Sequence, residues 1–410
     1  MTYGHCPAGA ARGTMKNVYS AFGSIAMSLL VVGCGSSTEP APEGTGTPSE
    51  ATSTAPTGTT AGSDSTVTDG TSTNATPVDQ AKPVDPEAVK PGEPLVGLPK
   101  DEWTWVDVPG SACGNGSETG FAVNLTDKSK DVMIFLEGGG ACWSGTSCYG
   151  GAGVLGTATY FSTGYGDLAF KTDPQRSFYF LQRGNDSNPF KDKNLVFVPY
   201  CSGDAYSGDN VTTLEFLGQK HETHFKGYKN MGLFLSRLVA TFGDAKRVWL
   251  AGDSAGGFGA ALSFGRVQAT FTGARVDAID DSGQPIAPDP ERWESFKKAW
   301  NMHLPADCAN CGDGPGAFVD YYRQKFPTNR FALISYEHDA VIAPFMNLSY
   351  GDFNKNLHGL MDHMDKTWSN GHYYVMNGFS HVGLTLPSND LKDWIYAMVN
   401  DDPTWKSVKP

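Results

Sequence analysis

The sequence lacks several features that mark large classes of protein. It has 31 Lys and Arg residues against 44 Asp and Glu residues, so its formal net charge is −13, and no Lys/Arg cluster stands out. This balance argues against nucleic-acid binding. No apolar run reaches the ~20 residues that a membrane-spanning helix requires. The one Cys-x-x-Cys pair, Cys308 and Cys311, lacks the second pair that would complete a zinc ribbon, so we expect no metal and no organic cofactor.

The first apolar segment is typical of an export signal of the bacterial lipoprotein type. Starting at Met15, a basic residue precedes an apolar stretch over residues 21–32, which runs into the cleavage box Val31-Val32-Gly33-Cys34. The stretch is too short for a transmembrane anchor. We therefore interpret residues 1–34 as a lipoprotein signal peptide, with residues 1–14 as an over-extended start.

This signal predicts a tethered protein. The thiol of Cys34 is expected to carry a lipid that anchors the chain to a membrane, and Gly35 is not the aspartate that retains such proteins at the inner membrane. The expected location is therefore the outer membrane or the cell surface. Residues 35–94 are rich in Ser, Thr, Pro and Gly and predict a disordered linker. Residues 95–410 are expected to form a single catalytic domain and to act as a monomer.

Six cysteines remain when Cys6 and the lipidated Cys34 are set aside. An even number of cysteines in an exported domain indicates disulfides. Two pairs are close in the sequence, and the remaining two cysteines are left to pair with each other. The expected disulfides are Cys142–Cys148, Cys308–Cys311 and Cys113–Cys201.

Apolar runs separated by turns predict an α/β fold with a mostly parallel sheet flanked by helices. The first two expected strands form an antiparallel pair, and polar residues gather where the later strands end. In an open α/β sheet this edge holds the ligand crevice. The expected strands are 103–108, 121–125, 132–136, 195–200, 247–251, 275–279, 330–336 and 373–376, and the expected helices include 228–242, 257–265 and 391–400.

The segment Gly252-Asp253-Ser254-Ala255-Gly256 has the pattern of a nucleophile elbow. An apolar strand precedes it and a helical stretch follows it. Gly252 and Gly256 leave room for a tight strand-to-helix turn, which would expose the Ser254 hydroxyl near the amino end of a helix. We therefore predict that Ser254 is a catalytic nucleophile.

A serine nucleophile needs a base and an acid that orients the base. His381 follows an apolar strand through a glycine-containing turn and is the expected base. Asp339 fits the usual order Ser, acid, His along the chain. Spacing alone leaves Glu337, Asp280 and Asp281 open as alternatives to Asp339.

The developing negative charge on the substrate needs preorganised donors. The run Gly138-Gly139-Gly140 follows the strand 132–136 and can bare backbone N–H groups. The N–H of Ala255, directly after the nucleophile, is the complementary donor. We expect Gly139, Gly140 and Ala255 to form an oxyanion hole.

Several motifs in order resemble those of the pectin acetylesterase/Notum carboxylesterase family. They are Phe135-Leu-Glu-Gly-Gly-Gly-Ala-Cys142, Cys201-Ser-Gly-Asp204, His224-Phe-Lys-Gly-Tyr228, Gly252-Asp-Ser-Ala-Gly-Gly257, Asp281-Ser-Gly283 and Tyr336-Glu-His-Asp339. The resemblance spans about residues 132–381 and implies an α/β-hydrolase-like fold. It also implies Ser254 as nucleophile, Asp339 as acid and His381 as base, and so favours Asp339 over Asp280.

One departure from the family concerns the acyl pocket. Family members usually carry an aromatic residue between the glycines and the cysteine, where this chain has Gly140 and Ala141 and places Trp143 after the cysteine. Trp143, Phe258 and Phe345 are the expected pocket residues, and we expect the pocket to be small.

The expected function is a serine carboxylesterase that removes acetyl or short acyl groups from a polysaccharide or glycoconjugate. Its partners would be an acylated carbohydrate or other small ester and, through the lipid, a membrane. A lipase-like or polyester-cleaving hydrolase with a long acyl channel is one alternative. A non-catalytic carbohydrate-binding lipoprotein is another.

Overall fold

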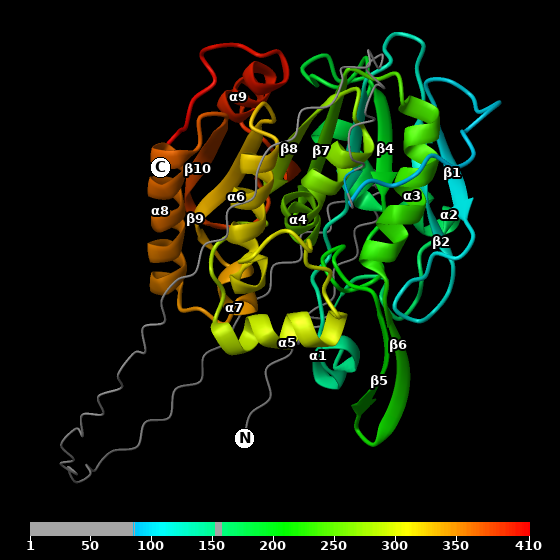
Figure 1. Cartoon of the computed structure of the whole chain (residues 1–410), viewed down its shortest axis with the longest axis vertical. Helices are drawn as coiled ribbons and strands as arrows, with labels where there is room; N and C mark the ends of the chain where they lie inside the picture. Colours follow the sequence, from blue (N-terminus) through cyan, green and yellow to red (C-terminus); the bar gives the residue numbers. More distant parts are fainter. Residues whose placement is uncertain (1–84, 86, 152–157) are drawn as a thin grey trace, which may run out of the picture. The chain divides into compact units, whose positions relative to one another are not determined.

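An eight-stranded sheet forms the centre of the molecule (Figure 1). The computed structural model describes residues 85, 87–151 and 158–410, so the predicted signal peptide, Cys34 and most of the predicted linker lie outside the described residues. The strand order is β1-β2-β4-β3-β7-β8-β9-β10. These strands are β1 (Trp103–Val108), β2 (Thr119–Asn124), β3 (Val132–Leu136), β4 (Asn194–Val198), β7 (Arg247–Asp253), β8 (Arg275–Asp281), β9 (Phe331–Asp339) and β10 (Gly371–Ser380).

The sheet is mostly parallel, as predicted. β1 pairs with β2 and β2 with β4 in antiparallel orientation, and every later neighbour pair is parallel. Parallel neighbours require crossover connections, which helices provide. The helices are α1 (Gly145–Tyr149), α2 (Asp167–Thr172), α3 (Gly227–Phe242), α4 (Ala255–Thr270), α5 (Pro290–Trp300), α6 (Pro315–Lys325), α7 (Ile342–Phe345), α8 (Tyr350–Thr367) and α9 (Asn389–Val399).

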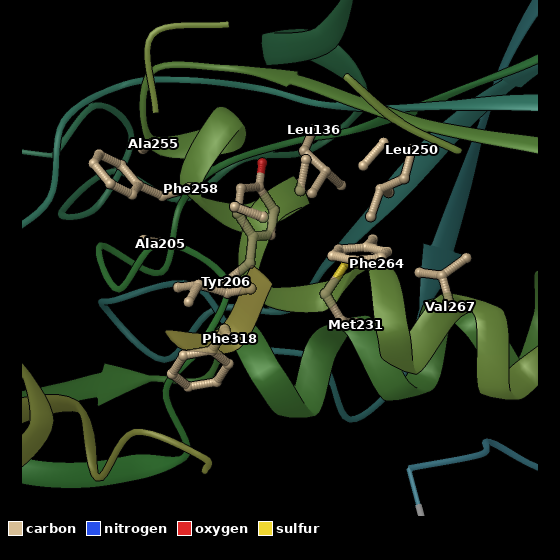
Figure 2. Close-up of a cluster of buried hydrophobic side chains, with 14 of the residues drawn as sticks. Leu136, Ala205, Tyr206, Met231, Leu250, Ala255, Phe258, Phe264, Val267 and Phe318 are labelled. Carbon is tan, nitrogen blue, oxygen red and sulfur yellow. The ribbon is translucent and has the colours of Figure 1, made fainter. Parts of the chain in front are cut away.

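Alternating strand residues divide the core into two layers, one on each face of the sheet. Val248 and Leu250 of β7 belong to a cluster with α3, α4, α6 and α8, whereas Trp249 and Ala251 belong to a cluster with α2 and α9. The period of two follows from the pleat, which points successive side chains to opposite faces. Figure 2 shows part of the first cluster, in which Leu136 and Leu250 from neighbouring strands face Phe264 of α4.

A hairpin of β5 (Asn210–Phe216) and β6 (Gln219–Phe225) projects at the end of the sheet where α1 and α5 lie (Figure 1). It was not predicted. Four short 3₁₀ turns complete the described elements: η1 (Pro174–Ser177), η2 (Tyr179–Leu181), η3 (Cys311–Asp313) and η4 (Gly383–Thr385).

The folded domain begins earlier than predicted. Residues 87–94 were expected in the linker, but the Val89 N–H donates to Thr270 Oγ1 of α4 at 3.1 Å and the Gly92 N–H to the Ser236 carbonyl of α3 at 2.9 Å. Glu87 is buried and its carboxylate contacts His303 Nε2 at 2.9 Å. Backbone groups of this segment are therefore satisfied by the domain.

The described cysteines pair as predicted, in the disulfides Cys113–Cys201, Cys142–Cys148 and Cys308–Cys311. The first joins the segment after β1 to the loop after β4, and the second pins the chain after the glycine run to α1. Disulfides are typical of exported proteins. Across the described ranges, no helix has both the length and the hydropathy needed to cross a bilayer.

Candidate active site

Ser254 occupies the turn between β7 and α4 with φ 54° and ψ −118°. This backbone conformation is rare for a residue with a side chain. The Ser254 N–H donates to the Asp281 carbonyl at 2.7 Å, which holds the turn against β8. A Cβ at Gly256 would overlap the Leu136 carbonyl, and one at Gly252 would overlap the Gly256 carbonyl. The two glycines of the motif are thus required by close backbone contacts.

The structure brings Ser254, His381 and Asp339 together from the ends of three strands. His381 Nε2 lies 2.9 Å from Ser254 Oγ, and His381 Nδ1 lies 2.9 Å from Asp339 Oδ2. Asp339 is fully buried, and its other oxygen accepts the N–H groups of Val341 and Ile342. The result is a continuous hydrogen-bonded chain from a buried carboxylate through an imidazole to a hydroxyl.

The other acid candidates have different partners. Asp280 accepts the Gly283 N–H, and Glu337 contacts His358. Asp281 accepts the N–H groups of Gly383 and Leu384 at 3.0 and 2.7 Å. Asp281 therefore fixes the loop that follows His381 instead of touching the imidazole.

The surroundings favour a charged imidazole. Burial of the ring lowers the pKa of His381, but the hydrogen bond to Asp339 and the charges of Asp339, Asp281 and Asp253 outweigh it and raise the pKa above its usual value. Burial, reinforced by the charge of Asp281, raises the pKa of Asp253 to about 7. Acidic groups thus crowd the buried side of the site.

The residues predicted to form the oxyanion hole lie in the loop after β3 and at the start of α4. Gly139 and Gly140 have φ of 150° and 81°, values that favour glycine. Gly140, Ser254 and Ala255 line one hollow. Within the described residues, the N–H groups of Gly139, Gly140 and Ala255 have no hydrogen-bond acceptor.

The hollow beside Ser254 is small and apolar, with a cavity volume of about 30 Å³. Phe258 and Phe345 line it as predicted, but Trp143 does not. The Trp143 ring packs on Phe345 and Phe296, at centroid distances of 5.8 and 5.0 Å. The remaining lining residues are Ala141, Ala205, Val341 and Ile342.

Sequence reasoning singled out Ala141 beside Gly140 but missed Ala205, Val341 and Ile342. The apolar run Ala340-Val341-Ile342-Ala343 directly after Asp339 could have indicated a pocket wall, because it follows the polar residues Glu337-His338-Asp339. The sequence around Ala205 gives no such indication.

Among the described side chains, no group of three or more His, Cys, Asp or Glu residues is placed to hold a metal ion.

Known proteins share this fold and parts of the sequence. The pectinacetylesterase family model matches residues 102–306, a range that contains Ser254 but ends before Asp339 and His381. Palmitoleoyl-protein carboxylesterase notum2 of Xenopus laevis is 31% identical over 48% of this chain and 42% of its own length. Human palmitoleoyl-protein carboxylesterase NOTUM is 26% identical over 42% of this chain and 34% of its own length. The matches thus span less than half of these relatives.

The fold of this chain also resembles that of a solved structure. The Wnt deacylase Notum of Drosophila superimposes with a TM-score of 0.52 at 19% identity and covers 71% of this chain and 87% of the solved chain. Its likeness supports the same mostly parallel sheet flanked by helices. With the family model matching half of its residues, this chain belongs to the pectinacetylesterase family.

Proposed function

We propose that this protein is a serine carboxylesterase that removes acetyl or other short acyl groups from a polysaccharide or glycoconjugate. The observation that carries the proposal is the hydrogen-bonded chain Asp339–His381–Ser254 opening on a small apolar hollow. The family and the names of the relatives, which are carboxylesterases, agree with ester hydrolysis.

The geometry supplies each group that acyl transfer needs. Ser254 Oγ attacks the acyl carbon while His381 Nε2 takes its proton, and Asp339 holds the imidazole and stabilises its charge. The N–H groups of Gly139, Gly140 and Ala255 stabilise the oxyanion. His381 then protonates the leaving alcohol as its C–O bond breaks. Water, activated by the same imidazole, hydrolyses the acyl-serine.

The size of the hollow supports a short acyl group. Its cavity volume of about 30 Å³ and its apolar lining suit the methyl of an acetyl group. The relatives are named for palmitoleoyl groups, whose long chain needs far more space.

Exposed rings near the site support a carbohydrate substrate. The Phe379 side chain is 58% exposed and Tyr350 is 43% exposed, and their rings lie 4.7 Å apart. Phe379 precedes His381 by two residues, which along an extended chain is about 7 Å. Exposed aromatic rings offer flat apolar faces with polar edges, which match the faces of sugar rings. These rings were not among the predicted site residues.

The test is a series of p-nitrophenyl esters. We expect kcat/KM to fall steadily from acetyl through butyryl to octanoyl, because the hollow excludes longer chains. A maximum at octanoyl would instead favour a lipase-like or polyester-cleaving hydrolase. Labelling of Ser254 by a fluorophosphonate, absent in Ser254→Ala, separates an esterase from a non-catalytic carbohydrate-binding protein.

A further inference from the structure

Gln284 is a buried amide that contacts the acid of the candidate site. It lies in the loop after β8, and its side chain is fully buried. Its Nε2 donates to Asp339 Oδ2 at 3.1 Å and to Ser335 Oγ at 2.9 Å. The same Asp339 oxygen lies 2.9 Å from His381 Nδ1. One carboxylate oxygen is therefore shared between the imidazole and this amide.

The partners of Gln284 fix which end of the amide faces Asp339. A carboxylate only accepts hydrogen bonds, and the Ser335 hydroxyl donates its own proton to the Tyr336 carbonyl at 2.9 Å. Both groups therefore need a donor, and the amide nitrogen has two N–H groups to supply. The amide oxygen has no hydrogen-bond partner among the described residues. Turning the amide over would place this oxygen against two acceptors.

The backbone on both sides of this amide is held in place. The Ser282 N–H donates to the Ile334 carbonyl of β9 at 2.9 Å. The Gln284 carbonyl accepts the Ile286 N–H at 2.7 Å. The contact between Gln284 and Asp339 is thus built into the loop and does not depend on a mobile surface side chain.

Asp339 has a donor for each of its acceptor sites. Its Oδ1 accepts the N–H groups of Val341 and Ile342, both at 2.9 Å, and its Oδ2 faces His381 and Gln284. A carboxylate offers about four lone-pair sites. None of the described lysines or arginines forms an ion pair with Asp339. Gln284 is therefore the neutral donor that competes with the imidazole for Oδ2.

This competition bears on the protonation of the imidazole. The carboxylates that act on His381 are Asp339 of β9, Asp281 of β8 and Asp253 of β7, and they raise the pKa of His381 together with the hydrogen bond to Asp339. A donor on Oδ2 offsets part of the negative charge that the imidazole meets. Without it, the protonated imidazole would be favoured further. A protonated imidazole cannot act as a base.

We propose that Gln284 is a positioning residue that acts through Asp339, sharing the charge of Oδ2 and so keeping His381 available as a neutral base. The catalytic consequence rests on the proposed esterase function. The inference places Gln284 in control of the acid limb of the pH profile. KM is expected to change little, because Gln284 does not line the hollow.

The first test compares pH profiles of kcat/KM for p-nitrophenyl acetate. Gln284→Met keeps the length of the side chain and removes both N–H groups. We expect the midpoint of the acid limb to rise by about half a pH unit, so that activity below the midpoint falls roughly three-fold while the plateau is kept. Gln268→Met is the matched control, because Gln268 is a buried glutamine of α4 whose Nε2 donates only to backbone carbonyls. Its midpoint should match that of the natural chain.

A midpoint that is unchanged or lower in folded Gln284→Met would overturn the proposal. An equal rise in Gln268→Met would also overturn it, because the effect would then follow from loosening of the core. If Gln284→Met does not fold, Gln284→Asn takes its place. Its shorter side chain keeps an amide but withdraws it from Asp339, so the midpoint should again rise.

The second test needs no activity. In Ser254→Ala chains that carry isotope-labelled histidine, the Cε1–H resonance of His381 gives the midpoint directly by nuclear magnetic resonance, and its absence in His381→Ala identifies it. Adding Gln284→Met should raise this midpoint. An unmoved midpoint would refute the role of Gln284 even if the natural chain is an esterase. A raised midpoint with no esterase activity in the natural chain would refute the proposed function and leave the role of Gln284 intact.

Discussion

At the scale of single residues, the proposed chemistry depends on three side chains of unequal weight. Ser254→Ala or His381→Ala should lower kcat by on the order of 10⁶, and Asp339→Asn by about 10⁴, because the imidazole then loses its orienting partner. Circular dichroism should show that the variants stay folded. If folded Asp339→Asn stays active while Asp280→Asn is inactive, the acid is misassigned.

In the proposed mechanism, the raised pKa of His381 sets the acid limit of activity. The base must be neutral, so kcat/KM should rise with pH through a midpoint above about 6.5, the usual histidine value. The same shift means that the charged imidazole stabilises the fold at low pH and that this contribution is lost as pH rises through the raised pKa. Asp339→Asn should move the midpoint down. An unchanged midpoint would show that Asp339 does not act on His381.

The sequence predicts some of these residues better than others. Ser254 could be predicted from its neighbours in the sequence, because close backbone contacts require glycines on both sides of it. The acid could not be chosen by spacing, because Asp280, Asp281, Glu337 and Asp339 all lie at strand ends. The strand register distinguishes Asp339 from the other three acids, because Asp339 pairs with Ser380, the residue before His381.

At the scale of elements, the end of β10 and the start of α8 present the exposed rings Phe379 and Tyr350. Phe379→Ala should raise KM for an acetylated polysaccharide roughly five-fold, since an aromatic contact contributes about 1 kcal/mol. The kinetics of p-nitrophenyl acetate should not change. Tyr396→Ala, an exposed aromatic of α9, is the matched control. Equal effects on the polymer and the small ester would argue against a sugar contact.

Strands and helices with a clear periodic pattern of apolar residues could be predicted from the sequence, whereas polar elements could not. The sheet strands and α3, α4 and α9 appear within a few residues of their expected bounds. The β5–β6 hairpin was missed because β5 buries no residue, and its turn at Leu217-Gly218 lacks the usual asparagine or aspartate. Trp143 was misplaced because sequence does not show which way a ring turns.

At the scale of the whole molecule, we propose that a lipid on Cys34 anchors the enzyme and leaves its domain intact. Cys34→Ala should release the protein from membranes, as fractionation would show, with unchanged kcat on p-nitrophenyl acetate. Membrane association that persists in this variant would contradict the anchor.

The mostly parallel sheet could be predicted from its buried apolar runs, but the strand order could not, because β4 inserts between β2 and β3.

The order of the site residues along the chain has a consequence for biosynthesis. Ser254 follows β7, whereas Asp339 ends β9 and His381 follows β10, the last strand of the sheet along the chain. A growing chain, made at about 5–20 residues per second, completes the serine turn well before the histidine emerges. In the proposed mechanism the hydroxyl has no base until then, so we expect a chain that stops before residue 381 to be inactive. The proposed esterase activity would therefore report completed molecules.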